Sequence, residues 1–340
     1  MQRRILMIPT RWGMAKRAAS SSSGMVKLIT YSMRVSKTGK QSIGVLLNKD
    51  ESILPLKNIP SLSKKEVADM QSFIELAGLD GVDKIKSFIN QNPQLLAPDL
   101  LVKTKKTIIH APIPQPIRNV ICVGKNYSDH VLEVKKAEAA RPGTTTAPMI
   151  TTEVPASPVF FTKAPECVIG YGAAIESHSK ITKWLDWEVE LAVVIGTGGK
   201  NIKAQDAMAH VFGYTIANDV TAREIQKKHG QWFKGKTLDS TCPLGPAIVP
   251  ACCLDASDLA IKLSVNGVLK QSSRTSKMIH SISAIIASLS EGFTLLPGDI
   301  ILTGTPDGVG FARTPPEVLK NGDIVEAEIE SIGKLKNPVV

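Results

Sequence analysis

The sequence predicts an α+β protein in which β-structure dominates. Eight short apolar runs, each about as long as a strand, follow one another after residue 119, with Gly- and Pro-containing turns between them. Helical patterns are few: two lie between residues 63 and 91, and one begins at residue 282. Many short strands with few helices favour an antiparallel or mixed sheet with covering helices, beside a small N-terminal α/β region.

The N-terminal region is expected to be a small accessory domain over residues 25–116. Strands are predicted at 26–33 and 42–50, and helices at 63–78 and 81–91. The stretch HAPIPQPIRN, residues 110–119, has three prolines in five residues, which neither a helix nor a central strand accommodates. It marks the predicted boundary to a catalytic domain over 117–340.

The catalytic domain is expected to contain the eight strands and one helix. The strands are predicted at 120–124, 158–163, 187–196, 210–219, 245–250, 259–267, 298–304 and 322–333, and the helix at 282–295.

The positive charge of the chain is concentrated at its N-terminus. The formal net charge is +10, but residues 1–40 hold nine Lys or Arg and no acidic residue, which leaves 32 basic and 31 acidic side chains beyond residue 40. The body is therefore nearly neutral, and no basic stripe for nucleic acid is expected. Residues 1–24 are rich in Arg and Ser, which predicts a mitochondrial transit peptide. The alternative is a disordered basic tail that carries no targeting signal.

The cysteines and the hydropathy indicate a soluble protein of a reducing compartment. No run approaches the 18 apolar residues of a membrane span. The five cysteines include no C-x-x-C pair, so neither a structural zinc nor a disulfide framework is expected. They are Cys122, Cys167, Cys242, Cys252 and Cys253.

Two glutamates in an apolar strand predict a metal site. In DWEVELAVVIG, Glu188 and Glu190 are two residues apart and share one face of a strand. Asp219 ends another apolar run. Adjacent buried carboxylates repel unless a cation is present, and a site of oxygen donors suits Mg²⁺ or Mn²⁺. The alternative is that Glu188 and Glu190 form the solvated face of an edge strand.

Further polar residues cluster in GKNYSDHVLE and in LTGTPDGVG. His130 and Glu133 are three apart on a predicted helix capped by Ser128 or Asp129, so the carboxylate could orient the imidazole as a general base. A solvated surface pair is the alternative. The glycine-rich second stretch could bring backbone amides and Thr305 to a carboxylate ligand, although such turns are common.

Residues 230–237, GQWFKGKT, match the phosphate-loop pattern G-x-x-x-x-G-K-[ST]. A phosphate loop needs a buried strand before it and a helix that starts at the Lys. Here the preceding stretch is polar, and four Pro or Gly residues follow within 14 positions. The nucleotide hypothesis is therefore poor, and Lys236 needs another explanation.

Five ordered motifs together resemble the fumarylacetoacetate hydrolase family. They are CVGKNYSDHVLE, DWEVELAVVIG, YTIANDVTARE, FKGKTLDSTCPLGP and GDIILTGTPDGVG, and the resemblance extends over 117–340. It implies a mixed β-roll, usually dimeric, with Mg²⁺ or Mn²⁺ held by Glu188, Glu190 and Asp219. The segment 134–156, after the motif of His130, is longer and richer in Pro and Thr than the family pattern.

The same resemblance assigns roles to the remaining residues. Lys236 falls on the active-site lysine, so its GKT would contact a substrate acid. His130 and Glu133 fall on the catalytic pair of a lid. Thr305 falls on the substrate-contacting threonine, and Arg223 and Gln226 fall on positions that contact substrate in some members.

The family chemistry that the resemblance implies acts on 2-oxo acids. Members interconvert the enol and keto forms of oxaloacetate, hydrolyse acylpyruvates or decarboxylate oxaloacetate, and in each case the cation stabilises an enolate. We expect an oxaloacetate tautomerase acting on a small 2-oxo dicarboxylic acid, as a homodimer in mitochondria. Acylpyruvate hydrolase and oxaloacetate decarboxylase are the alternatives.

Overall fold

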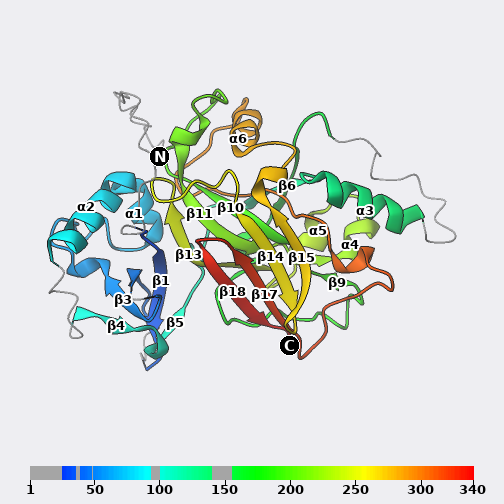
Figure 1. Ribbon diagram of the computed structural model, residues 1–340, viewed down its shortest axis with the longest axis horizontal. Coiled ribbons are helices and arrows are strands. Elements are labelled where there is room, and N and C mark those ends of the chain that lie inside the picture. Colours follow the sequence, from blue (N-terminus) through cyan, green and yellow to red (C-terminus); the bar gives the residue numbers. More distant parts are fainter. Residues whose placement is uncertain (1–24, 36–38, 48, 93–99, 140–154) are drawn as a thin grey trace, which may run out of the picture.

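The computed structural model describes residues 25–35, 39–47, 49–92, 100–139 and 155–340. The predicted transit peptide (1–24) and most of the Pro/Thr-rich segment (140–154) lie outside the described residues. Figure 1 shows a large central sheet, with the N-terminal region at one end and the helices α3, α4 and α5 at the other.

Twelve strands form the large sheet, in the order β4-β3-β2-β1-β13-β11-β10-β16-β6-β7, with β5 paired to β1 and β8 to β13. Their bounds are β1 Leu28–Met33, β2 Ser42–Leu47, β3 Ser52–Pro55, β4 Val102–Lys103, β5 Thr107–Ile109, β6 Val120–Gly124, β7 Val159–Lys163, β8 Val168–Ile169, β10 Val189–Ile195, β11 Val211–Asn218, β13 Cys242–Pro250 and β16 Ile300–Leu302. The pairs β16–β6 and β13–β8 are parallel and the other pairs of this sheet are antiparallel. This mixed sheet confirms the predicted fold class.

A second sheet packs on the first and has the order β15-β14-β17-β18. Its strands are β14 Ala260–Val265, β15 Val268–Arg274, β17 Ile324–Ile329 and β18 Gly333–Pro338, and a small pair is formed by β9 Leu185–Asp186 and β12 Thr221–Ala222. The α-helices are α1 Met70–Leu76, α2 Gly78–Gln91, α3 Ser128–Ala139, α4 Arg223–Lys228, α5 Phe233–Lys236 and α6 Ile282–Ser290.

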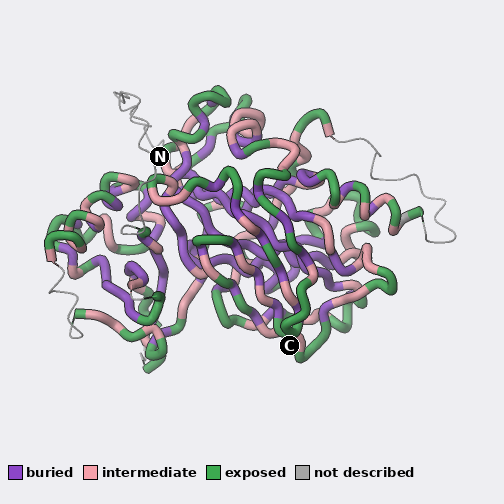
Figure 2. The backbone as a smooth tube through the Cα atoms, in the orientation of Figure 1, coloured by how far each residue is buried: buried purple, intermediate pink, exposed green. Residues whose placement is uncertain are grey.

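The two faces of the large sheet bury separate apolar clusters because side chains alternate along each strand. On β10, Leu191 and Val193 belong to the cluster that includes Leu263 of the second sheet. Ala192 and Val194 belong to the cluster that includes residues of α1 and α2. Figure 2 shows the resulting band of buried backbone through the central strands. Glu190 is two residues before Ala192, so its side chain lies on the same face of the sheet as Ala192 and the helices α1 and α2.

The N-terminal region continues the large sheet. β1 pairs antiparallel with β13, with Leu28 opposite Ile248. Phe73 of α1 packs edge-on against Phe212 of β11, with ring centroids 6.3 Å apart. The region thus covers one face of the strands that carry the candidate site.

Several elements differ from the sequence prediction. The expected helix at 63–78 begins only at Met70, because the Asp69 side chain accepts from Ser72 N at 2.7 Å and caps a new helix there. The run 322–333 ends as a strand at Ile329, and Gly333 begins the unpredicted β18. Helix α3 begins at Ser128 itself, so neither Ser128 nor Asp129 precedes it as a cap.

Candidate metal centre and active site

Three buried carboxylates meet at one end of the β10–β11 pair. Glu188 precedes β10, Glu190 lies on it and Asp219 follows β11, and the antiparallel register sets Val189 opposite Asn218. Each acid offers a carboxylate oxygen, and these oxygens lie within 4.8 Å of one another. Since β10 runs between β11 and β16, the edge-strand alternative is wrong.

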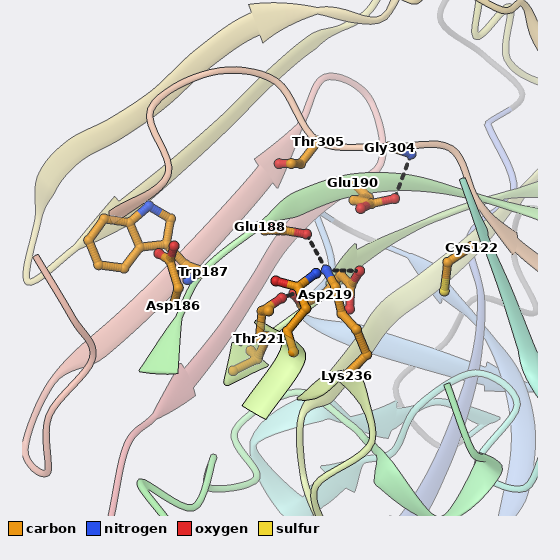
Figure 3. A network of polar contacts seen from close by, with 12 residues as sticks. Cys122, Asp186, Trp187, Glu188, Glu190, Asp219, Thr221, Lys236, Gly304 and Thr305 are labelled. Atoms are coloured by element: carbon orange, nitrogen blue, oxygen red, sulfur yellow. Dashed lines mark hydrogen bonds and ion pairs between the residues drawn. The ribbon is translucent and has the colours of Figure 1, made fainter. Parts of the chain in front are cut away.

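Basic side chains surround this group (Figure 3). Lys236 Nζ donates to Glu188 Oε2 and to Asp219 Oδ2, each at 2.6 Å. Lys163 Nζ lies 2.8 Å from Asp219 Oδ1, and Arg223 Nη2 lies 2.6 Å from Glu188 Oε1. Lys163 and Lys236 are almost fully buried, so their charges are little screened by water.

The surroundings shift the pKa values of Glu188 and Glu190 in opposite directions. Burial disfavours the Glu188 anion, but Arg223 and Lys236 outweigh burial and lower its pKa to about 2. Burial, and then the charges of Asp219 and Glu188, raise the pKa of Glu190 well above its ordinary value. The carboxylate of Glu190 accepts a hydrogen bond from Gly304 N at 2.6 Å. Its charged form therefore needs further positive charge nearby.

The donor set fits a hard divalent cation. All three residues offer carboxylate oxygens, which Mg²⁺, Mn²⁺ and Ca²⁺ prefer over nitrogen or sulfur. Their mutual approach in a buried place is unfavourable without a cation, and a divalent ion would relieve the repulsion that raises the Glu190 pKa. Glu188, Glu190 and Asp219 are the residues that would hold it.

Lys236 reaches this group from the end of a short helix. The stretch that matches the phosphate-loop pattern follows helix α4 rather than a strand, and α5 ends at Lys236 instead of starting there. The nucleotide hypothesis is therefore wrong for this stretch. Lys236 Nζ also lies 5.1 Å from the centroid of the Phe161 ring, in a cation–π contact.

Arg223, expected to contact substrate, is held by two acids. Its Nη2 atom is 2.9 Å from Asp186 Oδ2, in addition to its pair with Glu188, and its guanidinium stacks 4.4 Å from the Phe311 ring centroid. Gln226 lies one turn further along α4, and its Oε1 accepts from Arg223 Nη1 at 3.5 Å. These contacts aim the guanidinium at the carboxylate group.

His130 and Glu133 of α3 are joined as predicted. His130 Nδ1 lies 3.0 Å from Glu133 Oε1. Glu133 also accepts from the backbone N–H groups of Gly308 and Val309, at 2.8 and 3.4 Å. The solvated-pair alternative is wrong, because Glu133 fastens the helix to the loop. Its carboxylate accepts a hydrogen bond from Nδ1–H, so Nε2 of the neutral imidazole carries a lone pair that can accept a proton.

Thr305 lies on the loop after β16, 5% exposed. Gln271 Nε2 donates to Thr305 Oγ1 at 2.8 Å and to Pro306 O at 2.9 Å, while Gln271 Oε1 accepts from Val189 N at 3.0 Å. Gln271 thereby ties this loop to β10, and the Thr305 hydroxyl keeps its own proton to donate. The structure thus brings Thr305 to the same end of the sheet as the carboxylates (Figure 3).

The sequence did not reveal several residues that support the site. Lys163 and Gln271 lie in strands, and Asp186 begins the DWEVELAVVIG motif; the partners of all three lie far along the chain, so only tertiary structure shows them. Tyr127 is also buried at this end of the molecule, and its hydroxyl has no hydrogen-bond partner among the described residues. Burial, and then the charge of Glu190, raise the Tyr127 pKa. In the sequence, Tyr127 is marked only by its place in the motif GKNYSDHVLE, three residues before His130.

This combination of a mixed β fold and a carboxylate group beside a buried lysine belongs to a known class of protein. Residues 119–340 match the family model described as fumarylacetoacetate (FAA) hydrolase C-terminal. The chain belongs to the fumarylacetoacetate hydrolase family.

Individual relatives extend this assignment. The chain is 39% identical over 330 residues to "Oxaloacetate tautomerase fahd2, mitochondrial" of Xenopus laevis, and the aligned region covers 96% of this chain and 94% of that protein. It is 48% identical over 232 residues to "Oxaloacetate tautomerase YisK" of Bacillus subtilis (strain 168), covering 68% and 72%. A solved fumarylacetoacetate hydrolase from Exiguobacterium antarcticum superposes with a TM-score of 0.72 at 36% identity, covering 92% and 99%.

Proposed function

We propose that the protein is a metal-dependent oxaloacetate tautomerase, which converts enol-oxaloacetate to keto-oxaloacetate. The observation that carries the proposal is the buried group of three carboxylates paired with Lys236. Relatives that match most of the chain bear the name of this activity. Acylpyruvate hydrolysis and oxaloacetate decarboxylation are the alternatives within the family.

The proposed cofactor is Mg²⁺ or Mn²⁺, held by Glu188, Glu190 and Asp219. Such a cation, when bound, polarises the 2-oxo group and the carboxylate of the substrate. The protein supplies the remaining groups. Lys236 would set a positive charge beside the oxygen that becomes an enolate, and Arg223 and Gln226 would bind the outer carboxylate. Thr305 would donate to a substrate oxygen.

His130 is the proposed proton carrier. In the enol-to-keto reaction, the enol oxygen loses one proton and C3 gains one, so no atom is gained or lost overall. His130 Nε2 would accept a proton while Glu133 holds Nδ1–H, and the effect of a charged His130 on the pKa of Glu188 supports this role. Water has no part in this reaction, whereas hydrolysis of an acylpyruvate needs an activated water.

The substrate test uses the purified full chain with Mg²⁺. Enol-oxaloacetate, keto-oxaloacetate and an acylpyruvate are offered in parallel, and enol absorbance, CO₂ and free pyruvate are followed. We expect fast loss of the enol signal without CO₂ or cleavage, and loss of that rate in His130→Asn. Faster CO₂ release or acylpyruvate cleavage than tautomerisation would overturn the assignment.

The metal test uses Glu190→Gln, which keeps the size of the side chain and removes its charge. Since changing a residue that merely orients a ligand typically weakens metal binding about 10–100-fold, loss of a ligand should weaken it at least as much. Calorimetric titration with Mg²⁺ and Mn²⁺ measures this, with circular dichroism to show that the fold persists. Unchanged affinity would contradict the assignment of Glu190.

We further propose that the protein acts in mitochondria, because of the acid-free start of the chain and the mitochondrial relatives. A fusion of residues 1–30 to a reporter should enter mitochondria, and a fusion in which the Arg residues of this stretch are Gln should not. No described helix is long and apolar enough to cross a membrane.

A further inference from the structure

Two adjacent cysteines lie at the junction of the N-terminal region and the rest of the chain. Cys252 and Cys253 occupy the turn after β13, and their Sγ atoms are 3.9 Å apart. Cys252 is exposed and Cys253 is partly exposed, whereas the other three cysteines are buried. Cys253 also contacts the rims of both large apolar clusters. Solvent therefore reaches Cys252, while packing against the two apolar clusters holds Cys253 in place.

Positive charge from another part of the chain faces this pair. Lys86 of α2 places Nζ 3.7 Å from Cys252 Sγ, which is within the range of a hydrogen bond to sulfur. The charges of Cys253 and Cys252, and then of Asp83, oppose the effect of burial and raise the Lys86 pKa. Lys86 therefore carries its proton at neutral pH, and its charge favours a thiolate in this pair, lowering the pKa of Cys253 as well as contacting Cys252.

We propose that Cys252 and Cys253 form a peroxide-sensitive dithiol, in which Cys253 is the attacking thiolate and Cys252 the resolving thiol. In the first step, the Cys253 sulfur attacks one oxygen of hydrogen peroxide, the O–O bond breaks, and hydroxide leaves. In the second, the Cys252 sulfur attacks the sulfenic sulfur, loses its proton, and expels the hydroxyl group as water. Peroxide is reduced by two electrons, and the two thiols become one disulfide.

The assignment of roles follows from the surroundings of the two sulfurs. The hydrogen bond between the two thiols lowers the pKa of Cys253 to about 6 against the effect of burial, and the Val26 backbone N–H and Lys86 act in the same direction. A thiol with that pKa is mostly thiolate at pH 7, whereas an ordinary cysteine is so only to a few per cent. The same hydrogen bond, and then burial, raise the pKa of Cys252 above its ordinary value, so this thiol, the more exposed of the two, keeps its proton at pH 7.

The product would be easily reduced. Disulfides usually join Cα atoms about 4.4–6.8 Å apart, and adjacent residues across a trans peptide are only about 3.8 Å apart. A strained disulfide has a higher reduction potential, which is typical of regulatory rather than structural bonds. Oxidation would also remove the thiolate that faces Lys86, at the place where α2 meets the turn after β13.

The experiment treats the reduced full chain with hydrogen peroxide at pH 7 and alkylates the remaining thiols after denaturation. The tryptic peptide 237–262 contains Cys242 as well as the pair, so buried Cys242 is an internal control. We expect this peptide to carry a single alkyl group, on Cys242, with the other two cysteines unalkylated and together two hydrogens lighter than two free thiols, and all three cysteines to be alkylated once the protein has been treated with thioredoxin or dithiothreitol. A peptide that stays reduced while surface methionines oxidise would overturn the proposal.

Variants separate the two roles. Cys252→Ser should accumulate a sulfenic acid on Cys253 that dimedone labels, and Cys253→Ser should not be labelled at Cys252. Lys86→Met should slow disulfide formation by at least about threefold, because less thiolate is present. Lys84→Met is the matched control on the same helix; its ammonium pairs with Glu66 instead, so its rate should equal that of the wild type. Labelling of Cys252 in Cys253→Ser, or equal rates for the two lysine variants, would contradict the assignment.

Discussion

Lys236 donates to Glu188 and Asp219, two of the carboxylates proposed to bind the cation. In Lys236→Met the bulk of the side chain remains and the charge is lost. Because a preorganised charge beside a developing enolate is removed, turnover should fall on the order of 10²–10³-fold. Stopped-flow measurement of the decay of enol-oxaloacetate tests this. Lys234→Met, an exposed residue of the same helix, should keep the wild-type rate.

The same variant should also reveal a second role of Lys236. Without metal, its loss leaves two buried anions with less compensation, and breaking a buried ion pair typically costs about 3–5 kcal/mol. The free energy of unfolding of metal-free Lys236→Met should therefore fall, and saturating Mg²⁺ should restore most of it. Lys163 still faces Asp219 and Arg223 still faces Glu188, so the loss should lie at the lower end of this range. A variant that loses stability equally with and without metal would contradict this explanation.

At the level of single residues, the sequence indicated which charged residues belong to the site more readily than it indicated their interaction partners. Glu188 and Glu190 were found because two acids in an apolar strand violate the usual pattern. His130 and Glu133 were found because both lie on one helix. Asp186 gave no such signal: its partner, Arg223, follows 37 residues later, and the ion pair depends on how β9 and α4 pack.

Helix α5 shows how closely two elements must approach to place one side chain. A Cβ atom at Gly235 would lie 2.4 Å from Gln226 N and 2.6 Å from Gln226 Cα, both backbone atoms of α4. Gly235→Ala should therefore push α5 away from α4 and displace Lys236. We expect turnover to fall at least about tenfold, since displacements near 1 Å cost up to about 100-fold.

The control for this prediction lies on the same helix. Lys234→Ala adds no contact, because its side chain is exposed, and it should leave turnover and stability near the wild-type values. Unfolding in urea distinguishes local displacement from global instability. Full activity of Gly235→Ala would show that α5 does not have to pack so closely on α4.

The turn before α1 predicts a pH dependence of stability. Glu66 accepts hydrogen bonds from the Ser63 side chain and backbone and from Lys84, which lower its pKa to about 2 from an ordinary 4.5. A pKa lowered by folding stabilises the protein above the unfolded-state value, and this contribution disappears as pH falls from about 4.5 to about 2. The stability difference between the wild type and Glu66→Gln should be largest near neutral pH and shrink over that interval.

Urea unfolding over this pH range measures the difference, and Ser63→Ala, which removes one donor, should reproduce part of it. A difference that stays constant down to pH 2 would contradict the role of Glu66. This turn also explains the error in the predicted helix. Ser63 and Glu66 exchange hydrogen bonds as at a helix N-terminus, but Asp69 then caps a separate helix that begins at Met70. The sequence pattern therefore predicted the capping residues correctly, but not the break between residues 63 and 70.

Elements with strong local patterns were predicted, and those defined by neighbours were not. β10 and β11 are long apolar runs, and their central positions follow from composition alone. By contrast, β15 contains Lys270, Gln271 and Arg274, and becomes a strand because β14 pairs with it. The short α4 and α5 have few residues with which to show a helical period.

At the scale of the whole molecule, the region 25–116 and the remainder share a sheet and an apolar core. We predict that the fragment 117–340 aggregates, because it exposes the edge of β13 and the face that includes Phe212 and Ile248. Size-exclusion chromatography of this fragment beside 25–340, which lacks only the predicted transit peptide, tests this. A soluble, monodisperse and active fragment would instead show that the two regions fold independently. The proposed homodimer stays a prediction for the same chromatography.

The pairing of β1 with β13 has a consequence for how the chain is made. Leu28 meets Ile248, which lies 220 positions later, 248 minus 28. At about 5–20 residues per second, a ribosome needs roughly 11–44 s to make the intervening chain. Throughout that interval the first strand has one edge without its final partner. The nascent protein is therefore expected to depend on chaperones until β13 has emerged, and slowing synthesis before residue 248 should increase its aggregation.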